Sequence, residues 1–163
     1  MKCIFNFGIL FLTILFIACN NKQPESAKEQ KTELVYPKGD KITNNNFSGT
    51  AWLNWLVPND SIFNCPVGNV TFEPGARTNW HKHPGGQILL ISEGKGYYQE
   101  RGKSAQLLQK GDVVKIPPYA EHWHGATSNE QFSHIAINTN VQEGVAIWLE
   151  PVTDEYYDSL TGQ

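Results

Sequence analysis

Apolar residues are distributed along the chain in three ways. Residues 4–17 form a continuous apolar run, residues 20–46 are mostly polar or charged, and from Phe47 onward apolar residues come in short bursts. Turn-forming sequences rich in Gly, Pro, Asn and Asp separate these bursts, among them Glu93-Gly94-Lys95-Gly96. Because no segment after Phe47 shows a sustained helical period, the pattern predicts one all-β domain over residues 47–163.

The expected strands occupy the bursts between the turns. They are residues 67–72, 79–83, 87–92, 96–100, 112–116, 122–124, 133–138 and 145–149. Helix is expected only near the C-terminus, where Thr153 can cap one or two turns. The 14 glycines and 9 prolines suit many short strands joined by tight turns, and 163 residues suffice for one such domain but not two.

The first 18 residues have the arrangement of an export signal. Lys2 precedes the apolar run, which is short for a bilayer span. Ala18-Cys19 at its end resembles the lipobox of bacterial lipoproteins, which implies a signal peptide over residues 1–18, a lipidated Cys19 and a polar tether over residues 19–46. A plain secretory signal or an uncleaved anchor helix is the alternative. In each case we expect an exported domain, and the lipid would hold it at the membrane, facing the periplasm or the cell surface.

Charge and cysteine content limit which partners and which covalent cross-links are expected. The formal net charge is −3, and loss of Lys2 with the signal makes it more negative. Since no basic cluster follows, we expect no nucleic-acid partner. Cys3 leaves with the signal and Cys19 would carry the lipid, so Cys65 has no disulfide partner in the domain and is expected to be a small buried residue.

All five histidines lie between positions 81 and 134, as two His-x-His pairs and one single residue. Residues two apart in a strand point to the same face, so His81 with His83, and His122 with His124, each direct two imidazoles one way. Two such strands facing each other in a barrel make a nitrogen-rich pocket. Because imidazole is a common ligand of first-row divalent metals, the pattern predicts a metal site.

The residues that frame these histidines resemble the two motifs of the cupin superfamily. Gly75-x5-His81-x-His83-x3-Gln87-x6-Gly94 is similar to the first motif, and Gly111-x5-Pro117-x4-His122 is similar to the second. The resemblance implies a jelly-roll β-barrel, also called a double-stranded β-helix. It further implies that one divalent ion is bound by His81, His83, Gln87 and His122.

Gln87 stands where the cupin motif usually has Glu. A neutral amide leaves the charge of the ion uncompensated by the protein, which raises its Lewis acidity and makes its oxidation harder. The substitution favours polarising a substrate or binding an anion over redox cycling.

A narrower resemblance, to the bacterial manganese-dependent hydroxynitrile lyases of the cupin type, extends from about Val67 to Tyr157. It is carried by residues 70–78, 121–126, 134–137 and 148–155 together with the metal motif. The resemblance implies Mn²⁺ as the cofactor, with Fe²⁺, Zn²⁺ or Ni²⁺ as alternatives because the donor set accepts each of them. It places His124 and His134 beside the open coordination positions as the catalytic residues, and leaves open which one is the base.

Strand parity suggests further pocket residues. Asn138 shares a face with His134, and Gly68 shares a face with Val70, so these three are expected to line the substrate pocket. Gly68 leaves room for a substrate, although a bulge or turn also explains a strand glycine. Arg77 is expected to be a solvated surface residue rather than a group that steers an anion.

Three functions fit these features. The first is a non-redox lyase that acts on a small hydroxy or carbonyl compound, such as a cyanohydrin cleaved to an aldehyde plus cyanide. The second is a cupin dioxygenase, which Gln87 disfavours. The third is a non-catalytic lipoprotein that binds a small ligand or a metal. In each case the partner is a small molecule, and the cupin resemblance implies a homo-oligomer.

Overall fold

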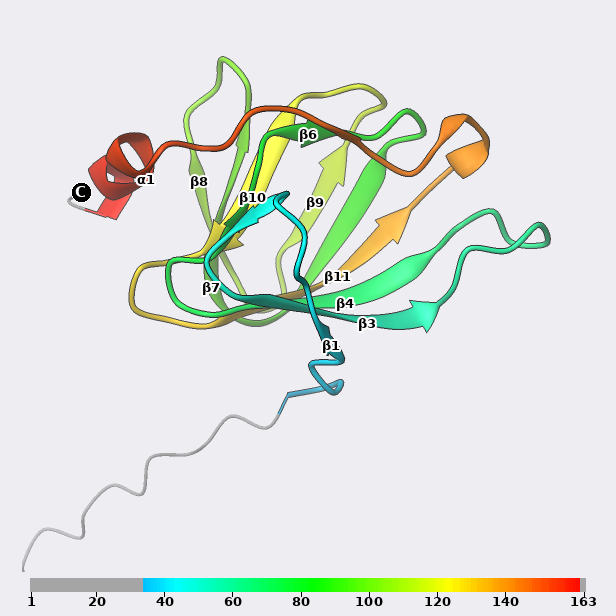
Figure 1. The fold of residues 1–163 in the computed structure, drawn as a ribbon, viewed down its shortest axis with the longest axis horizontal. Helices are drawn as coiled ribbons and strands as arrows, with labels where there is room; N and C mark the ends of the chain where they lie inside the picture. Colours follow the sequence, from blue (N-terminus) through cyan, green and yellow to red (C-terminus); the bar gives the residue numbers. More distant parts are fainter. Residues whose placement is uncertain (1–33, 162–163) are drawn as a thin grey trace, which may run out of the picture. The chain divides into compact units, whose positions relative to one another are not determined.

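Short antiparallel strands roll into one continuous sheet around an apolar core in the computed structural model, which describes residues 34–161 (Figure 1). The predicted signal peptide and the proposed lipid site at Cys19 lie outside the described residues. The prediction of an all-β, rolled-sheet fold is confirmed. Between residues 34 and 161, no helix is both long and apolar enough to span a membrane.

The elements follow one another as strands with two short helical segments near the end of the chain. The strands are β1 (Asp40–Lys41), β2 (Phe47–Ser48), β3 (Ala51–Val57), β4 (Val67–Phe72), β5 (Arg77–Thr78), β6 (His81–Lys82), β7 (Gln87–Glu100), β8 (Gln106–Gln109), β9 (Val113–Ile116), β10 (His122–Ala126), β11 (Phe132–Asn138) and β12 (Ile147–Trp148). A 3-10 helix (Val141–Glu143) precedes β12, and α1 (Asp154–Thr161) ends the described part. The predicted C-terminal helix is therefore confirmed.

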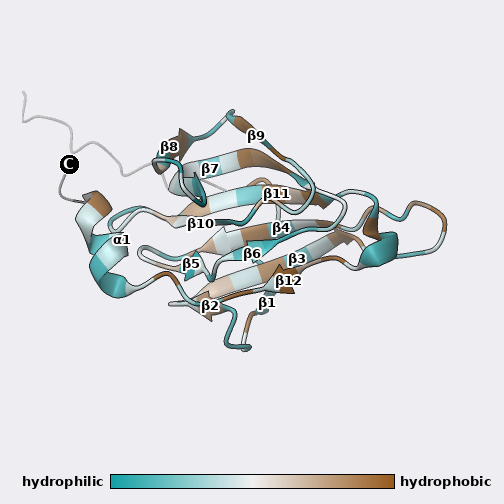
Figure 2. Ribbon diagram, turned by 90° about the horizontal axis from the view of Figure 1, so that it is seen from above, coloured by the Kyte–Doolittle hydropathy of each residue, from teal (hydrophilic) through white to brown (hydrophobic). Residues whose placement is uncertain are grey.

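The main path through the sheet runs β1-β3-β4-β11-β7-β10-β5-β2. β8 and β9 pair with β7, while β6 pairs with both β10 and β12. Figure 2 shows strongly apolar stretches in β3, β7 and β9 and mostly hydrophilic residues in α1. The apolar residues that face inward along β4, β7 and β11 form the main core, in which Phe72, Leu89 and Phe132 have no exposed surface.

The Glu93-Gly94-Lys95-Gly96 sequence, which predicts a turn, lies inside the single long strand β7. The register of β7 against β11 shifts between Ser133 and His134, as in a β-bulge. Gly94 has a φ of +67°, and a Cβ there would lie 1.7 Å from the Gln131 oxygen. The expected turn was wrong because β7 continues through this segment: the extra residue at the register shift is Ser92, Gly94 pairs with Phe132, and β7 pairs with β11 and β9 in its first half and with β10 and β8 in its second.

The ordered domain begins before Phe47. Asp40 and Lys41, which fall in the stretch predicted to be tether, pair with Leu53 and Trp52 of β3. The Ile42 N–H donates to the Ala51 oxygen at 2.9 Å. These contacts use backbone groups, so the polar composition of the segment gives no sign of them.

Arg77 is buried, with 5% of its surface exposed, so the expectation of a solvated arginine was wrong. Its guanidinium donates to the Val152 oxygen from Nε at 3.3 Å and from Nη2 at 3.1 Å, and also pairs with Asp154. It lies 4.5 Å from the centre of the Tyr157 ring. The side chain therefore holds the start of α1 against the sheet. Cys65, expected to be buried, is a free thiol of intermediate exposure.

Candidate metal centre

Three histidines, one from β6, one from the segment just after it and one from the adjacent strand β10, meet in one buried cluster. His81 of β6 and His122 of β10 are direct cross-strand partners, and His83 follows β6 with its side chain on the same face as His81. One ring nitrogen from each of the three lies within 4.8 Å of the others. The resemblance to the two cupin motifs singled out these three histidines as ligands, and the structure brings them together.

Each cluster imidazole lies with Nδ1 against a backbone carbonyl. The distances are 3.0 Å from His81 to the Asn79 oxygen, 2.5 Å from His83 to the Val145 oxygen and 2.9 Å from His122 to the Ala120 oxygen. A carbonyl only accepts, so Nδ1 carries the hydrogen and Nε2 keeps its lone pair. The Nε2 atoms of His83 and His122 are buried without any partner in the described protein. Such unpaired acceptors are what a bound cation would satisfy.

Burial keeps these imidazoles neutral. It lowers the pKa of His122 to about 4 and also lowers the pKa of His83. The pKa of His81 lies well below its ordinary value, first because of burial and then because His122 and His83 lie beside it. Neutral imidazoles can offer lone pairs to a metal at neutral pH, so the protonation state fits a metal site.

Gln87, the first residue of β7, supplies a fourth donor group on the pocket wall. Its Nε2 donates to Oδ1 of Asn138 at 3.0 Å, whereas its Oε1 is buried without a partner in the described protein. Three imidazole nitrogens and one amide oxygen fit a first-row divalent ion. The residues predicted as ligands therefore suit a metal, and a three-histidine cluster that can hold an ion is present.

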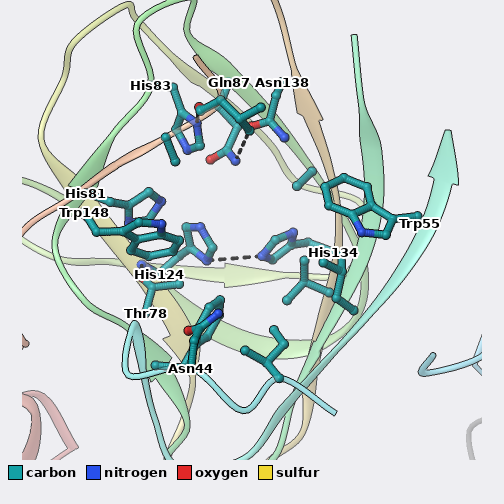
Figure 3. A pocket seen from close by; sticks show the side chains of 18 residues that line it. Asn44, Trp55, Thr78, His81, His83, Gln87, His124, His134, Asn138 and Trp148 are labelled. Atoms are coloured by element: carbon teal, nitrogen blue, oxygen red, sulfur yellow. Dashed lines mark hydrogen bonds between the residues drawn. The ribbon is translucent and has the colours of Figure 1, made fainter. Parts of the chain in front are cut away.

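His124 and His134 lie together beside this cluster (Figure 3). His134 Nε2 is 3.2 Å from His124 Nδ1, and the two rings meet edge to face with centroids 4.6 Å apart. The His124 ring also lies 5.3 Å from His81 and 5.9 Å from His122. Burial lowers the pKa of His134 to about 3, and burial together with the neighbouring imidazole of His134 takes the pKa of His124 well below its ordinary value. The outer nitrogens, His124 Nε2 and His134 Nδ1, are buried without partners.

All of these groups except His122 line one cavity of about 370 Å³. Gly68, Val70 and Asn138, predicted from strand parity, line it as well. A Cβ on Gly68 would lie 2.7 Å from Leu53 Cδ1, so the glycine makes room for the Leu53 side chain of the cavity wall.

Sequence reasoning missed several residues of the cavity wall. These are Ile42, Asn44, Phe47, Trp55, Thr78, Val145, Ala146 and Trp148. Trp148 packs against His81 with ring centroids 4.7 Å apart, and Phe47 lies 5.6 Å from Trp148. Trp148 lies in the predicted strand over residues 145–149 and in the resemblance over residues 148–155, but its register against β6 could not be read from the sequence.

The chain is similar to a protein-family model, to a named lyase and to solved structures. The family model described as "Cupin domain" matches residues 68–138. The chain is 40% identical over 112 residues to an (R)-mandelonitrile lyase from Granulicella tundricola, covering 65% of this chain and 86% of that protein. A cupin-like protein from Thermotoga maritima superposes with a TM-score of 0.77 and 51% identity, over 79% of this chain and 98% of that one. A predicted oxalate decarboxylase from Thermotoga maritima shares the fold alone, with a TM-score of 0.55 and 23% identity over 68% of this chain and 91% of that one.

Proposed function

The chain belongs to the cupin family, and on that premise we propose that it is a manganese-dependent lyase that cleaves a small cyanohydrin to an aldehyde or ketone plus cyanide. The observation that carries the proposal is the composition of one cavity. Three buried imidazoles, two of them (His83 and His122) with an unpartnered Nε2 in the described protein, and the unpartnered oxygen of Gln87 lie beside a second, hydrogen-bonded pair of imidazoles. The similarity to a mandelonitrile lyase supports the same reaction type.

The proposed cofactor would be held by His81, His83, His122 and Gln87. A divalent ion bound there supplies a Lewis acid that lowers the pKa of a coordinated hydroxyl group. The neutral amide of Gln87 adds no negative charge to the site, which supports a non-redox role rather than a dioxygenase.

The His124–His134 pair can both accept and donate a proton. One hydrogen lies between His124 Nδ1 and His134 Nε2, and each ring is neutral. If His124 donates that hydrogen, its Nε2 carries a lone pair and His134 Nδ1 carries a hydrogen; if His134 donates it, the roles are reversed. In either tautomer the pair has one acceptor and one donor at its outer nitrogens.

We assign the base to His124, because its ring contacts two of the cluster imidazoles. In the cleavage direction, His124 Nε2 takes the hydroxyl proton, the carbonyl double bond forms, and the bond to the nitrile carbon breaks with its electron pair leaving as cyanide. The proton is returned from the pair to cyanide, so hydrogen cyanide leaves and both imidazoles are neutral again.

The proposal predicts that variants of His124 and variants of the cluster residues lose different properties. In the chain from Asn20 onward, purified without a histidine tag, His124→Asn should lower cyanide release from mandelonitrile about 10³-fold while metal content stays near that of the wild type. The His81→Ala, His122→Ala double variant should lose both the cyanide release and the bound metal. Elemental analysis and a cyanide assay measure the two quantities.

Two results would contradict the lyase assignment. Stoichiometric metal without cyanide release from any of a panel of cyanohydrins would leave a binding protein, and metal-dependent oxygen uptake with a candidate substrate would identify a dioxygenase. Absence of metal from the wild type would contradict the proposed cofactor site itself.

We further propose that the domain is exported and held at the membrane by a lipid on Cys19. The Ala18-Cys19 pair after an apolar run supports this. Incorporation of labelled palmitate into the wild type but not into Cys19→Ala would be the expected result.

A further inference from the structure

We propose that Asn138 is a positioning residue that holds the Gln87 amide with its oxygen toward the three-histidine cluster. This inference rests on the divalent ion proposed above, but it does not depend on the identity of the substrate. Strand parity predicted Asn138 only as a residue of the pocket wall.

The contact is built into the pairing of two strands. Asn138 is the last residue of β11, Gln87 is the first residue of β7, and the two are direct cross-strand partners. Both are buried, each with 5% of its surface exposed. The Asn138 N–H donates to the Pro66 oxygen at 3.1 Å, which fixes the backbone behind the side chain. Figure 3 shows the bond from Gln87 to Asn138 on the wall of the cavity.

An amide has two different ends, and only one of them suits a metal. The oxygen has lone pairs to donate, whereas the NH₂ group offers two hydrogens. With the Asn138 amide kept in its present orientation, rotating the Gln87 amide by half a turn would place its oxygen against Oδ1 of Asn138, so two acceptors would face each other in a buried position. Because unpaired buried acceptors are costly, Asn138 Oδ1 favours the orientation that leaves Gln87 Oε1 free for the cluster.

The need for this partner follows from the use of glutamine. A carboxylate at position 87 would present an oxygen whichever way it turned, so its orientation would not need to be selected. A neutral amide at the same position presents its oxygen in only one of its two orientations, and a neighbour that accepts from its nitrogen favours that one. Asn138 meets that requirement because its Oδ1 lies 3.0 Å from Gln87 Nε2.

The test measures Mn²⁺ affinity of the full chain by electron paramagnetic resonance of free Mn²⁺. Asn138→Leu keeps the approximate shape and removes the acceptor, so the affinity should fall about tenfold. Asn138→Asp can only accept from Gln87 Nε2 and should bind Mn²⁺ at least as tightly as the wild type. The matched control is Asn44→Leu on another part of the cavity wall, where the side-chain oxygen accepts from the Asn46 N–H and no change in Mn²⁺ affinity is expected.

A double-mutant cycle separates positioning from general structural damage. With Gln87→Ala already present, Asn138→Leu should cause no further loss of affinity, because there is no amide left to orient. An equal loss with and without Gln87, or no loss from Asn138→Leu alone, would overturn the inference. A wild type that binds Mn²⁺ but releases no cyanide would overturn the proposed function only, and a wild type that binds no divalent metal would overturn both.

Discussion

Each histidine of the cluster has its ring orientation set by a backbone carbonyl, but the carbonyls come from different distances along the chain. His81 and His122 each use the residue two positions earlier, Asn79 and Ala120. His83 uses Val145, which is 62 residues away. The first two orientations are therefore local to their motifs, whereas the third requires the segment before β12 to be in place.

Burial of these imidazoles makes stability depend on pH. A histidine whose folded pKa lies below its unfolded value of about 6.5 contributes stability that is present above pH 6.5 and is lost as the pH falls toward the folded pKa. His134, with a folded pKa of about 3 and no exposed surface, is the clearest case. The metal-free protein should therefore become less stable as the pH falls from 7.5 to 5.0.

The contribution of His134 can be isolated with His134→Phe, since the ring already lies beside Phe72 and Phe132. Between pH 7.5 and 5.0 the metal-free wild type should lose about 2 kcal/mol more unfolding free energy than this variant. Urea unfolding at the two pH values measures the difference. Parallel losses in the two proteins would show that His134 is already protonated in the folded state or stays neutral in the unfolded one.

At the scale of elements, α1 is attached to the sheet through a side chain from β5. Arg77 donates twice to the Val152 oxygen, pairs with Asp154 and lies over the Tyr157 ring, while the Tyr157 hydroxyl donates to the Ala126 oxygen at 2.7 Å. The contact between α1 and the sheet is buried, because the exposed fractions of Arg77 and Tyr157 are only 5% and 3%.

We expect Arg77→Met to destabilise the protein by about 2 kcal/mol, because the buried Val152 oxygen would lose a charged donor. The matched control is Lys103→Met, which breaks an ion pair with Glu100 at a largely exposed lysine and should change stability by less than about 0.5 kcal/mol. Chemical denaturation of both variants at pH 7.5 provides the comparison. Equal effects would mean that Arg77 contributes only as a surface charge.

The elements differ in how much of their structure the sequence alone predicts. Histidine spacing with glycine framing predicted the cluster, the apolar bursts between turns predicted the fold class, and strand parity predicted that Gly68, Val70 and Asn138 line the cavity, because all three are local patterns. Arg77 follows a Pro-Gly turn, and its direction depends on contacts with residues 75 or more positions later. Gly94 gave a turn signal because glycine is used both in turns and at strand positions with a positive φ and close backbone contact, as here against the Gln131 oxygen.

At the scale of the whole domain, the cavity is closed by segments from both ends of the described chain. Ile42 and Phe47 come from its beginning, Val145 and Trp148 come from near its end, and Phe47 packs against Trp148. None of the proposed metal ligands lies in these segments. His81, His83 and Gln87 themselves line the cavity, and the segment with Val145 and Trp148 contacts His83 and His81, so of the two closing segments only the one before Phe47 is separable from the metal-binding groups.

This separation predicts the effect of starting the domain at Phe47, the boundary that composition suggests. A chain beginning there lacks the β1 pairing with β3, the Ile42 contact with the core, and the Lys38 pair with Glu73 at 2.6 Å. Compared with a chain beginning at Glu33, its Tm should fall by about 5 °C or more, because the lost contacts are worth at least about 1 kcal/mol. Its Mn²⁺ affinity should change less than twofold, because the cluster histidines and Gln87 remain. Calorimetry and a Mn²⁺ titration on both chains test this, and equal Tm values would show that residues 33–46 add nothing to the fold.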